Sequence, residues 1–293
     1  MRIVRALLIY FAVVFVGGAL LSPWLFWLAQ TVAPNSHLAT SPFHRFVDRT
    51  LMGLAILGIW PLLRSIGATS FRDVGLVKPA GQWHRLGAGL AMGVGSFGII
   101  AAIAVMGRGR QINPQLAAQI TPKLIGETLA TVALVPLLEE VLFRGALFGA
   151  LRKACNWRAA LVVSSMLYAI VHFMTGKDVD PAGPIHWYSG LEVLPKMLRG
   201  FAKWDAVIPG FFTLTLVGML LGLAYQRTGN LYFSIGLHGG WIFWIKFYRV
   251  MTVPVDGANT WLWGGNNPTD GLLALGMLAV MWLVMALAKE KQR

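Results

Sequence analysis

The chain has 293 residues, of which 56% are hydrophobic and only 13% are charged. Soluble domains contain about a quarter charged residues, so this composition excludes a disordered chain, a coiled coil and a disulfide-framed secreted module. The formal net charge of +13 would suit nucleic-acid binding. However, the basic residues occur singly and in pairs between long apolar runs, where they meet lipid headgroups. The composition therefore predicts an integral membrane protein in a lipid bilayer, with no nucleic-acid partner.

Eight apolar segments are long enough, or nearly so, to cross a bilayer, which takes about 20 residues. In chain order they are 6–33, 50–67, 86–107, 124–151, 158–174, 206–226, 231–250 and 271–288. We expect an all-α fold, a single polytopic transmembrane domain over 1–293 with about eight membrane-spanning helices that enclose an intramembrane cavity. The longest connection, about 175–205, is amphipathic and is expected on the membrane surface.

The two ends of the chain decide the predicted orientation. Arg2 and Arg5 precede the first apolar segment, and Lys289, Lys291 and Arg293 close the chain. Basic residues next to membrane spans favour the cytoplasmic side, and this topology places 13 of the 25 Lys and Arg residues on that side against 11 on the other, with Arg144 inside a span. We therefore expect both termini in the cytoplasm, and a bacterial inner membrane as the location.

The fourth apolar segment carries three charged residues, which the membrane interior disfavours. Glu140 and Arg144 are four residues apart, so they share a helical face and are predicted to form an ion pair. Glu139 is rotated by about 100° from Glu140 and points towards a different neighbour. Pro136 is expected to kink this helix and to free a backbone carbonyl near Val132. A kinked helix with two differently directed carboxylates indicates a functional site.

Two of the six histidines lie within apolar segments, His172 in the fifth and His238 in the seventh. The others are expected in loops: His37, His44, His84 and His186. At 1.5 Å per residue, Glu139, His172 and His238 lie about 18, 21 and 10 Å from the ends of their segments on one side of the membrane. These three side chains are therefore expected to meet in one cavity within the membrane.

A glutamate and two histidines suit two kinds of hydrolytic site. A carboxylate and an imidazole can act as a general base on water while a second histidine donates to an oxyanion. The same residues can instead hold a divalent metal such as Zn with a bound water. The residues alone do not separate these, and each histidine by itself is equally well explained by contacts between helices. Buried Glu/His pairs also relay protons in transporters, a third alternative.

Three motifs resemble those of the CPBP (Abi) family of intramembrane proteases, which includes the CAAX prenyl endopeptidases and bacteriocin-processing and immunity proteins. The motifs are Glu139-Glu140-x-x-x-Arg144-Gly145, the histidine His172 at the end of the fifth segment, and Ser234-Ile235-Gly236-Leu237-His238. The resemblance covers roughly residues 70–250, the expected protease core, and is strongest over 130–245.

The resemblance implies an intramembrane endopeptidase that hydrolyses a peptide bond in a membrane-bound protein or peptide. Glu139 and His172 would activate the attacking water, and His238 would stabilise the tetrahedral oxyanion. Glu140 and Arg144 would hold the site together. In a metalloprotease of this kind, Glu139, His172 and His238 would be the metal ligands.

Two positions depart from the family pattern. Tyr168 stands where the family usually has phenylalanine, and its hydroxyl can join the polar network. Ile242 stands where a polar residue usually follows the last histidine by four positions. Because isoleucine donates no hydrogen bond, His238 would act alone, a neighbour such as Trp241 would substitute, or activity would be weaker. Ile242 thus favours the alternative, a non-proteolytic membrane scaffold or bacteriocin-immunity protein that retains the fold.

Overall fold

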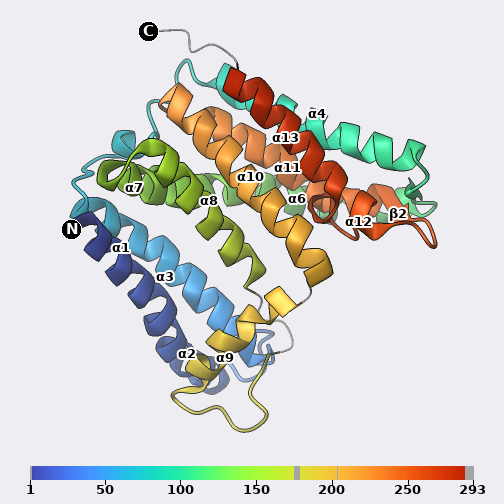
Figure 1. Ribbon diagram of the computed structural model, residues 1–293. Helices are drawn as coiled ribbons and strands as arrows, with labels where there is room; N and C mark the ends of the chain where they lie inside the picture. The colour runs from blue at the N-terminus through green and yellow to red at the C-terminus, as the bar shows by residue number, and fades with distance from the viewer. Residues whose placement is uncertain (1, 175–178, 203, 288–293) are drawn as a thin grey trace. The chain divides into compact units, whose positions relative to one another are not determined.

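The computed structural model describes residues 2–174, 179–202 and 204–287 (Figure 1). The chain is almost entirely helical, so the all-α expectation is confirmed. The elements are α1 (Arg2–Ala12), η1 (Val13–Gly17), α2 (Gly18–Val32), α3 (Phe43–Ser65), η2 (Phe71–Val74), α4 (Trp83–Met106), β1 (Arg110–Ile112), α5 (Leu116–Gln119), α6 (Pro122–Glu140), η3 (Val141–Phe148), α7 (Gly149–Ala154), α8 (Trp157–Phe173), α9 (Ser189–Met197), η4 (Leu198–Ala202), α10 (Trp204–Thr228), α11 (Tyr232–Met251), β2 (Thr252–Pro254), α12 (Thr260–Trp263), η5 (Pro268–Asp270) and α13 (Leu272–Leu287).

Each of the eight apolar segments coincides with helical structure, but not every helix meets the length and apolarity of a membrane span. Four helical stretches in the described part of the chain do so. They are Arg2–Val32, Phe43–Ser65, Trp83–Met106 and Val207–Thr228. The apolar helices Trp157–Phe173 and Leu272–Leu287 are shorter. The protein is therefore an integral membrane protein, while the total of eight spans stays a prediction.

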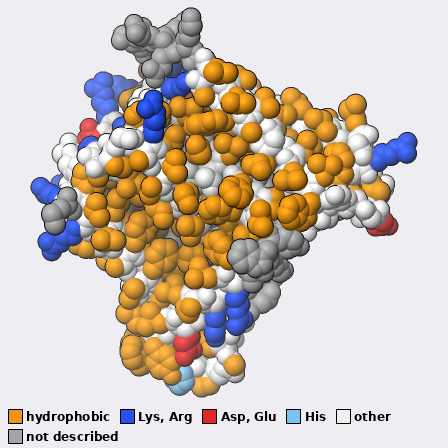
Figure 2. Space-filling view, viewed as in Figure 1, with side chains coloured by type: hydrophobic (Ala, Val, Ile, Leu, Met, Phe, Trp, Pro, Cys, Tyr) orange, Lys and Arg blue, Asp and Glu red, His pale blue; other side chains and the backbone are white. Residues whose placement is uncertain are grey.

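Apolar side chains dominate the face of the molecule shown in Figure 2, and lysines and arginines are few there. Large hydrophobic side chains such as Leu129, Leu134 and Leu283 are more than half exposed. Such a surface is the one a bilayer covers. The predicted orientation also used the basic C-terminal residues Lys289, Lys291 and Arg293. These residues lie outside the described part of the chain, as does position 288 of the last predicted segment.

The chain divides into two compact units. The first comprises residues 1–69 and 171–203, and the second comprises 70–170 and 204–293. In the first unit, α9 packs against α2 and α3 through Val193 and Met197. A Cβ added at Gly190 would overlap the carbonyl oxygen of Ala19, so glycine is required for this close approach. The predicted surface position of the 175–205 connection stays a prediction, and residues 175–178 and 203 lie outside the described part.

In the second unit, α4 and α11 are in direct backbone contact. Gly89 and Gly93 on α4 face Gly236 and Gly240 on α11, and both pairs have the four-residue spacing of close helix–helix contacts. A Cβ at Gly89, Gly93 or Gly236 would overlap a carbonyl oxygen of the facing helix. These contacts fix the position of His238, which lies between Gly236 and Gly240.

The strands β1 and β2 pair antiparallel and connect the ends of α4 and α11, with Arg110 opposite Pro254. The buried Arg110 guanidinium donates hydrogen bonds to the side chain and carbonyl of Thr252 and to the Gly265 carbonyl. It also lies 4.2 Å from the centre of the Tyr248 ring. Burial lowers the pKa of Arg110 from its ordinary value. The carbonyls and the ring stabilise the charge in place of water.

Candidate active site

The helix that carries the two carboxylates changes its winding directly after them. It begins at Pro122, where the hydroxyl of the cap residue Thr121 accepts from the Leu124 N–H. After Glu140 the chain continues as the wider π-helical segment η3 and returns to an α-helix at Gly149. Such π segments occur frequently at functional sites. The sequence predicted a kink at Pro136 but gave no sign of the π segment.

The carbonyl oxygen of Val132, which Pro136 was expected to free, lies beside α11. A Cβ at Gly239 would be 3.2 Å from this oxygen. The backbone of α11 therefore approaches α6 next to His238. The start of α11 is defined by local sequence: Gly229 ends α10 with a φ of 69°, and Asn230 accepts from the Tyr232 N–H through its side-chain oxygen.

Glu140 and Arg144 form the predicted ion pair. Nη1 of Arg144 lies 2.8 Å from Oε1 of Glu140, and the two side chains are 3% and 0% exposed. Nη2 of Arg144 donates to the Gly218 carbonyl on α10 at 3.4 Å. Because both charges are removed from water, each depends on the other for compensation. This pair joins α6 and η3 to α10.

His238 lies between the two carboxylates. Its Nδ1 is 3.0 Å from Oε1 of Glu140, and its Nε2 is 3.8 Å from Oε2 of Glu139. The Glu140 carboxylate, which is paired with Arg144, accepts this hydrogen bond, and Nδ1 of His238 is then the donor. The nitrogen that faces Glu139 is therefore Nε2, which holds a proton only when the imidazole is charged.

Tyr168 on α8 contacts Glu139, Arg144 and His238. Its hydroxyl donates a hydrogen bond to Glu139. The Arg144 guanidinium lies 4.6 Å from the centre of its ring, and the ring meets that of His238 edge to face at 6.4 Å. Tyr168 is 2% exposed. The Tyr168 hydroxyl thus lies at the polar cluster, while its part in catalysis stays a prediction.

Trp241 does not take the place of the missing polar residue at position 242. Its indole N–H donates to the Ser96 hydroxyl on α4 at 3.1 Å, and its side chain is buried. The donor is thus used to join α11 to α4, and the idea that Trp241 substitutes at the oxyanion is wrong. Ile242 is half-buried on α11.

His172 lies in the last turn of α8, and by its contacts it is part of the first unit. The five other predicted site residues all lie in the second unit: Glu139, Glu140, Arg144, Tyr168 and His238. The structure brings these five together, while a place for His172 beside Glu139 stays a prediction.

Two of the histidines expected in loops lie in helices instead. His44 and His84 occupy the first turns of α3 and α4, because both helices begin before their apolar runs. His44 also contacts Asp180, with Nδ1 2.8 Å from Oδ2. Polar residues in a first helical turn are invisible to a search for apolar runs alone, which explains the error.

A metal site in this protein would need several donor side chains close together among the described residues. Within them, no group of three or more His, Cys, Asp and Glu side chains is arranged to hold a metal ion. Glu139 and His238 supply two donor atoms 3.8 Å apart. Since zinc sites use three or four protein ligands, a metal here would need a third, the role predicted for His172.

The fold and this cluster define a helical membrane protein with a buried carboxylate–histidine–arginine site. A family model described as type II CAAX prenyl endopeptidase Rce1-like matches residues 121–244, from the cap of α6 into α11. All the predicted site residues fall within this stretch. The resemblance to CAAX prenyl endopeptidases, a family of proteases, is therefore confirmed for this part of the chain. No curated protein and no solved structure matched the chain in these comparisons.

Proposed function

We propose that the protein is an intramembrane endopeptidase of the CAAX-protease type, which hydrolyses a peptide bond in a membrane-associated protein or peptide. The observation that carries this proposal is the placement of His238 between two carboxylates of unequal surroundings. The match of residues 121–244 to a protease family supports the same reaction.

Glu139 is the proposed general base. Its side chain is 25% exposed, whereas that of Glu140 is fully buried and paired with Arg144. Water can therefore reach Glu139, and only Glu139 is placed to exchange protons with it. The Glu139 atom that is 3.8 Å from Nε2 of His238 is Oε2, and this atom is itself buried, so the attacking water would have to enter from the exposed edge of Glu139 to lie between the two side chains.

In the proposed reaction, Glu139 takes a proton from water as the water oxygen bonds to the carbonyl carbon. The oxyanion that forms accepts a hydrogen bond from Nε2–H of charged His238. The carbon–nitrogen bond then breaks, and the leaving nitrogen takes the proton from Glu139. This yields a carboxylic acid and an amine, the proton of the acid then passes to the amine, and the site is back in its starting state.

The charges of the cluster suit these reaction steps. With both glutamates ionised, Arg144 and charged His238 bring the sum to zero. When Glu139 takes its proton, the cluster gains one positive charge, which balances the negative charge of the oxyanion. A buried site with no net charge at either stage avoids the large cost of an uncompensated ion.

We propose that His172 shares in activating the water. Tyr168 and His172 are four residues apart on α8, so they lie on one face of that helix. Tyr168 already contacts Glu139. If the enzyme uses a divalent metal such as Zn, the ligands would be Glu139, His172 and His238, and the metal would lower the pKa of a bound water.

The test is an assay of the full-length protein in proteoliposomes with a farnesylated peptide that ends in a Cys-a-a-X motif. We expect Glu139→Gln to lower turnover by at least a hundredfold, the usual size of a general-base contribution. Glu127→Gln is the control, since Glu127 is an exposed residue of the same helix, paired only with Lys123. A folded Glu139→Gln protein with wild-type turnover would refute the proposed base. Repeating the assay with a chelator distinguishes the metal-dependent form of the mechanism.

A second candidate function is a non-proteolytic membrane scaffold or immunity protein, which the apolar Ile242 favours. The Ile242→Asn variant separates the two. If the wild type is inert and the variant cleaves the peptide, the scaffold is the better description. If the wild type already cleaves it, Ile242 is compatible with catalysis.

For the location we propose a bacterial inner membrane with both termini in the cytoplasm, and the position of Arg2 and Arg5 in the first turns of the apolar helix Arg2–Val32 supports this orientation for the N-terminus. Protease accessibility of a tag placed before Met1, in inverted and right-side-out vesicles, measures this directly.

A further inference from the structure

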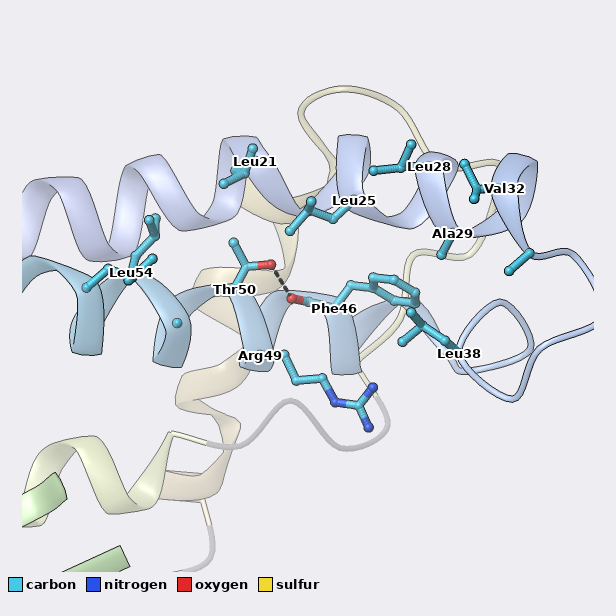
Figure 3. Close-up of a pocket in the computed structure, with 13 residues that line it drawn as sticks. Leu21, Leu25, Leu28, Ala29, Val32, Leu38, Phe46, Arg49, Thr50 and Leu54 are labelled. Atoms are coloured by element: carbon cyan, nitrogen blue, oxygen red, sulfur yellow. Dashed lines mark hydrogen bonds between the residues drawn. The ribbon is translucent and has the colours of Figure 1, made fainter. Parts of the chain in front are cut away.

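A groove of about 500 Å³ lies between α2 and α3 in the first unit (Figure 3). Apolar side chains from both helices line it, among them Leu25 and Leu28 on α2 and Leu54 and Leu57 on α3. The groove lies apart from the candidate active site in sequence, and none of the predicted site residues contributes to it.

Among the described residues that line this groove, Thr50 and Arg49 are the two with polar side chains. The Thr50 hydroxyl donates to the Phe46 carbonyl at 2.6 Å, so its proton is not available to an anionic ligand. Arg49 extends from α3 at the edge of the groove and is exposed. Within the described residues it makes no hydrogen bond or ion pair, whereas its neighbour Asp48 interacts with His44 and Asp180.

Both helices belong to stretches long and apolar enough to cross a membrane. Arg49 follows the first residue of α3 by six positions, or about 9 Å along the helix axis. Arg49 also directly precedes the apolar run of 50–67, so a bilayer that covers this run would have its surface near Arg49. Anionic headgroups attract such residues close to the bilayer surface.

We propose that this groove binds one anionic phospholipid, with an acyl chain along the leucines and the phosphate paired with Arg49. The competing occupant is a second copy of the chain. The net charge of +13 favours the lipid, because like charges on two copies repel each other whereas an anionic lipid is attracted.

The test uses the full-length protein in nanodiscs of phosphatidylcholine with a minor share of phosphatidylglycerol, and native mass spectrometry counts the lipids retained. We expect the wild type to retain one phosphatidylglycerol in preference to phosphatidylcholine. Arg49→Gln should lower this preference about fivefold, the effect of one basic residue at a membrane surface. Arg45→Gln removes an exposed charge one turn away that does not line the groove, and should leave the preference unchanged.

A second pair of variants tests the apolar part of the groove. A Cβ at Gly53 has no other atom within 4 Å, so Gly53→Phe should fill the groove without disturbing α3. This variant should retain neither lipid. Gly95→Phe on α4 adds the same ring at an exposed position that is equally open, and should behave as the wild type.

Three results would overturn the proposal. The first is an equal effect of Arg49→Gln and Arg45→Gln on the lipid preference. The second is unchanged lipid retention by Gly53→Phe. The third is a change from dimer to monomer in Gly53→Phe with no change in retained lipid, which would assign the groove to a contact between two copies of the chain.

Discussion

Oε1 of Glu140 contacts both Nη1 of Arg144, at 2.8 Å, and Nδ1 of His238, at 3.0 Å. One oxygen thus links the ion pair within α6 and η3 to the histidine on α11. The two adjacent glutamates therefore make different contacts: Glu140 binds Nδ1 of the histidine, and Glu139 faces its other nitrogen.

The buried ion pair should be revealed by losses of stability that do not add when both partners are replaced. Arg144→Met leaves Glu140 as an uncompensated buried charge and should lower the free energy of unfolding by about 3–5 kcal/mol. The double variant Glu140→Gln/Arg144→Met removes both charges and should be more stable than Arg144→Met alone. Thermal unfolding in detergent measures both. If the losses of Arg144→Met and of Glu140→Gln alone simply add in the double variant, the pair does not interact as described.

The Tyr168 hydroxyl should affect catalysis more than stability. Tyr168→Phe keeps the ring beside Arg144 and His238 but removes the hydrogen bond to Glu139, and hydrogen bonds to charged groups are worth about 1.5–3 kcal/mol. We expect a loss in kcat of roughly tenfold or more, with little change in KM. Tyr232→Phe is the control, because its hydroxyl donates to the Val77 carbonyl away from the cluster. Equal turnover of the two variants would show that Tyr168 is only a packing residue.

The backbone contact between α4 and α11 should tolerate no side chain. Gly93→Val and Gly240→Val each place branched carbons against the backbone of the facing helix and should abolish a folded, monodisperse protein, since overpacking even ordinary cores costs about 1–3 kcal/mol. Gly95→Val, two residues along α4 at an open position, should fold normally. Size-exclusion profiles in detergent compare the three, and normal profiles for all of them would contradict the contact.

Asp270, which lies outside the spans in η5, should make stability depend on pH. Burial raises the pKa of this carboxyl above its ordinary value, and the opposing hydrogen bonds from Thr269 and Asn267 are weaker effects. The ionised form therefore disfavours the folded state. This penalty is absent below the unfolded pKa of about 3.9 and grows as pH rises through the folded pKa.

Asp270→Asn removes the ionisation and should raise the melting temperature at pH 8. Its advantage over the wild type should shrink as the pH is lowered towards 4. Melting curves of both proteins across this range provide the measurement, and an advantage that is constant with pH would argue against a buried ionised carboxyl.

Much of the cluster could be predicted because charges are rare in apolar segments. Glu140 and Arg144 stood out for this reason, and helical spacing alone predicted their ion pair. The same reasoning separated Glu139 from Glu140, since one residue rotates a side chain by about 100° around a helix. Tyr168 was identified only through its departure from a family pattern.

Other features depend on contacts between segments far apart in the sequence. The π-helical segment after Glu140 has no residue signature, and the partner of Trp241 on α4 could not be foreseen from α11. The four-residue spacings of Gly89 with Gly93 and of Gly236 with Gly240 were visible, but nothing in either segment indicated that these two helices face each other. The hydrogen bond from Arg110 to the Gly265 carbonyl similarly depends on a loop that is distant in the sequence.

The glycine contact between α4 and α11 has a consequence for motion. Two helices whose backbones touch have no intervening side chains that could change rotamer, so they are expected to move as one rigid body. A substrate that needs more room near His238 would then gain it by displacement of α6 or α10. In such a movement the distance between His238 and the carboxylates of α6 would change, while the frame that holds the histidine would not.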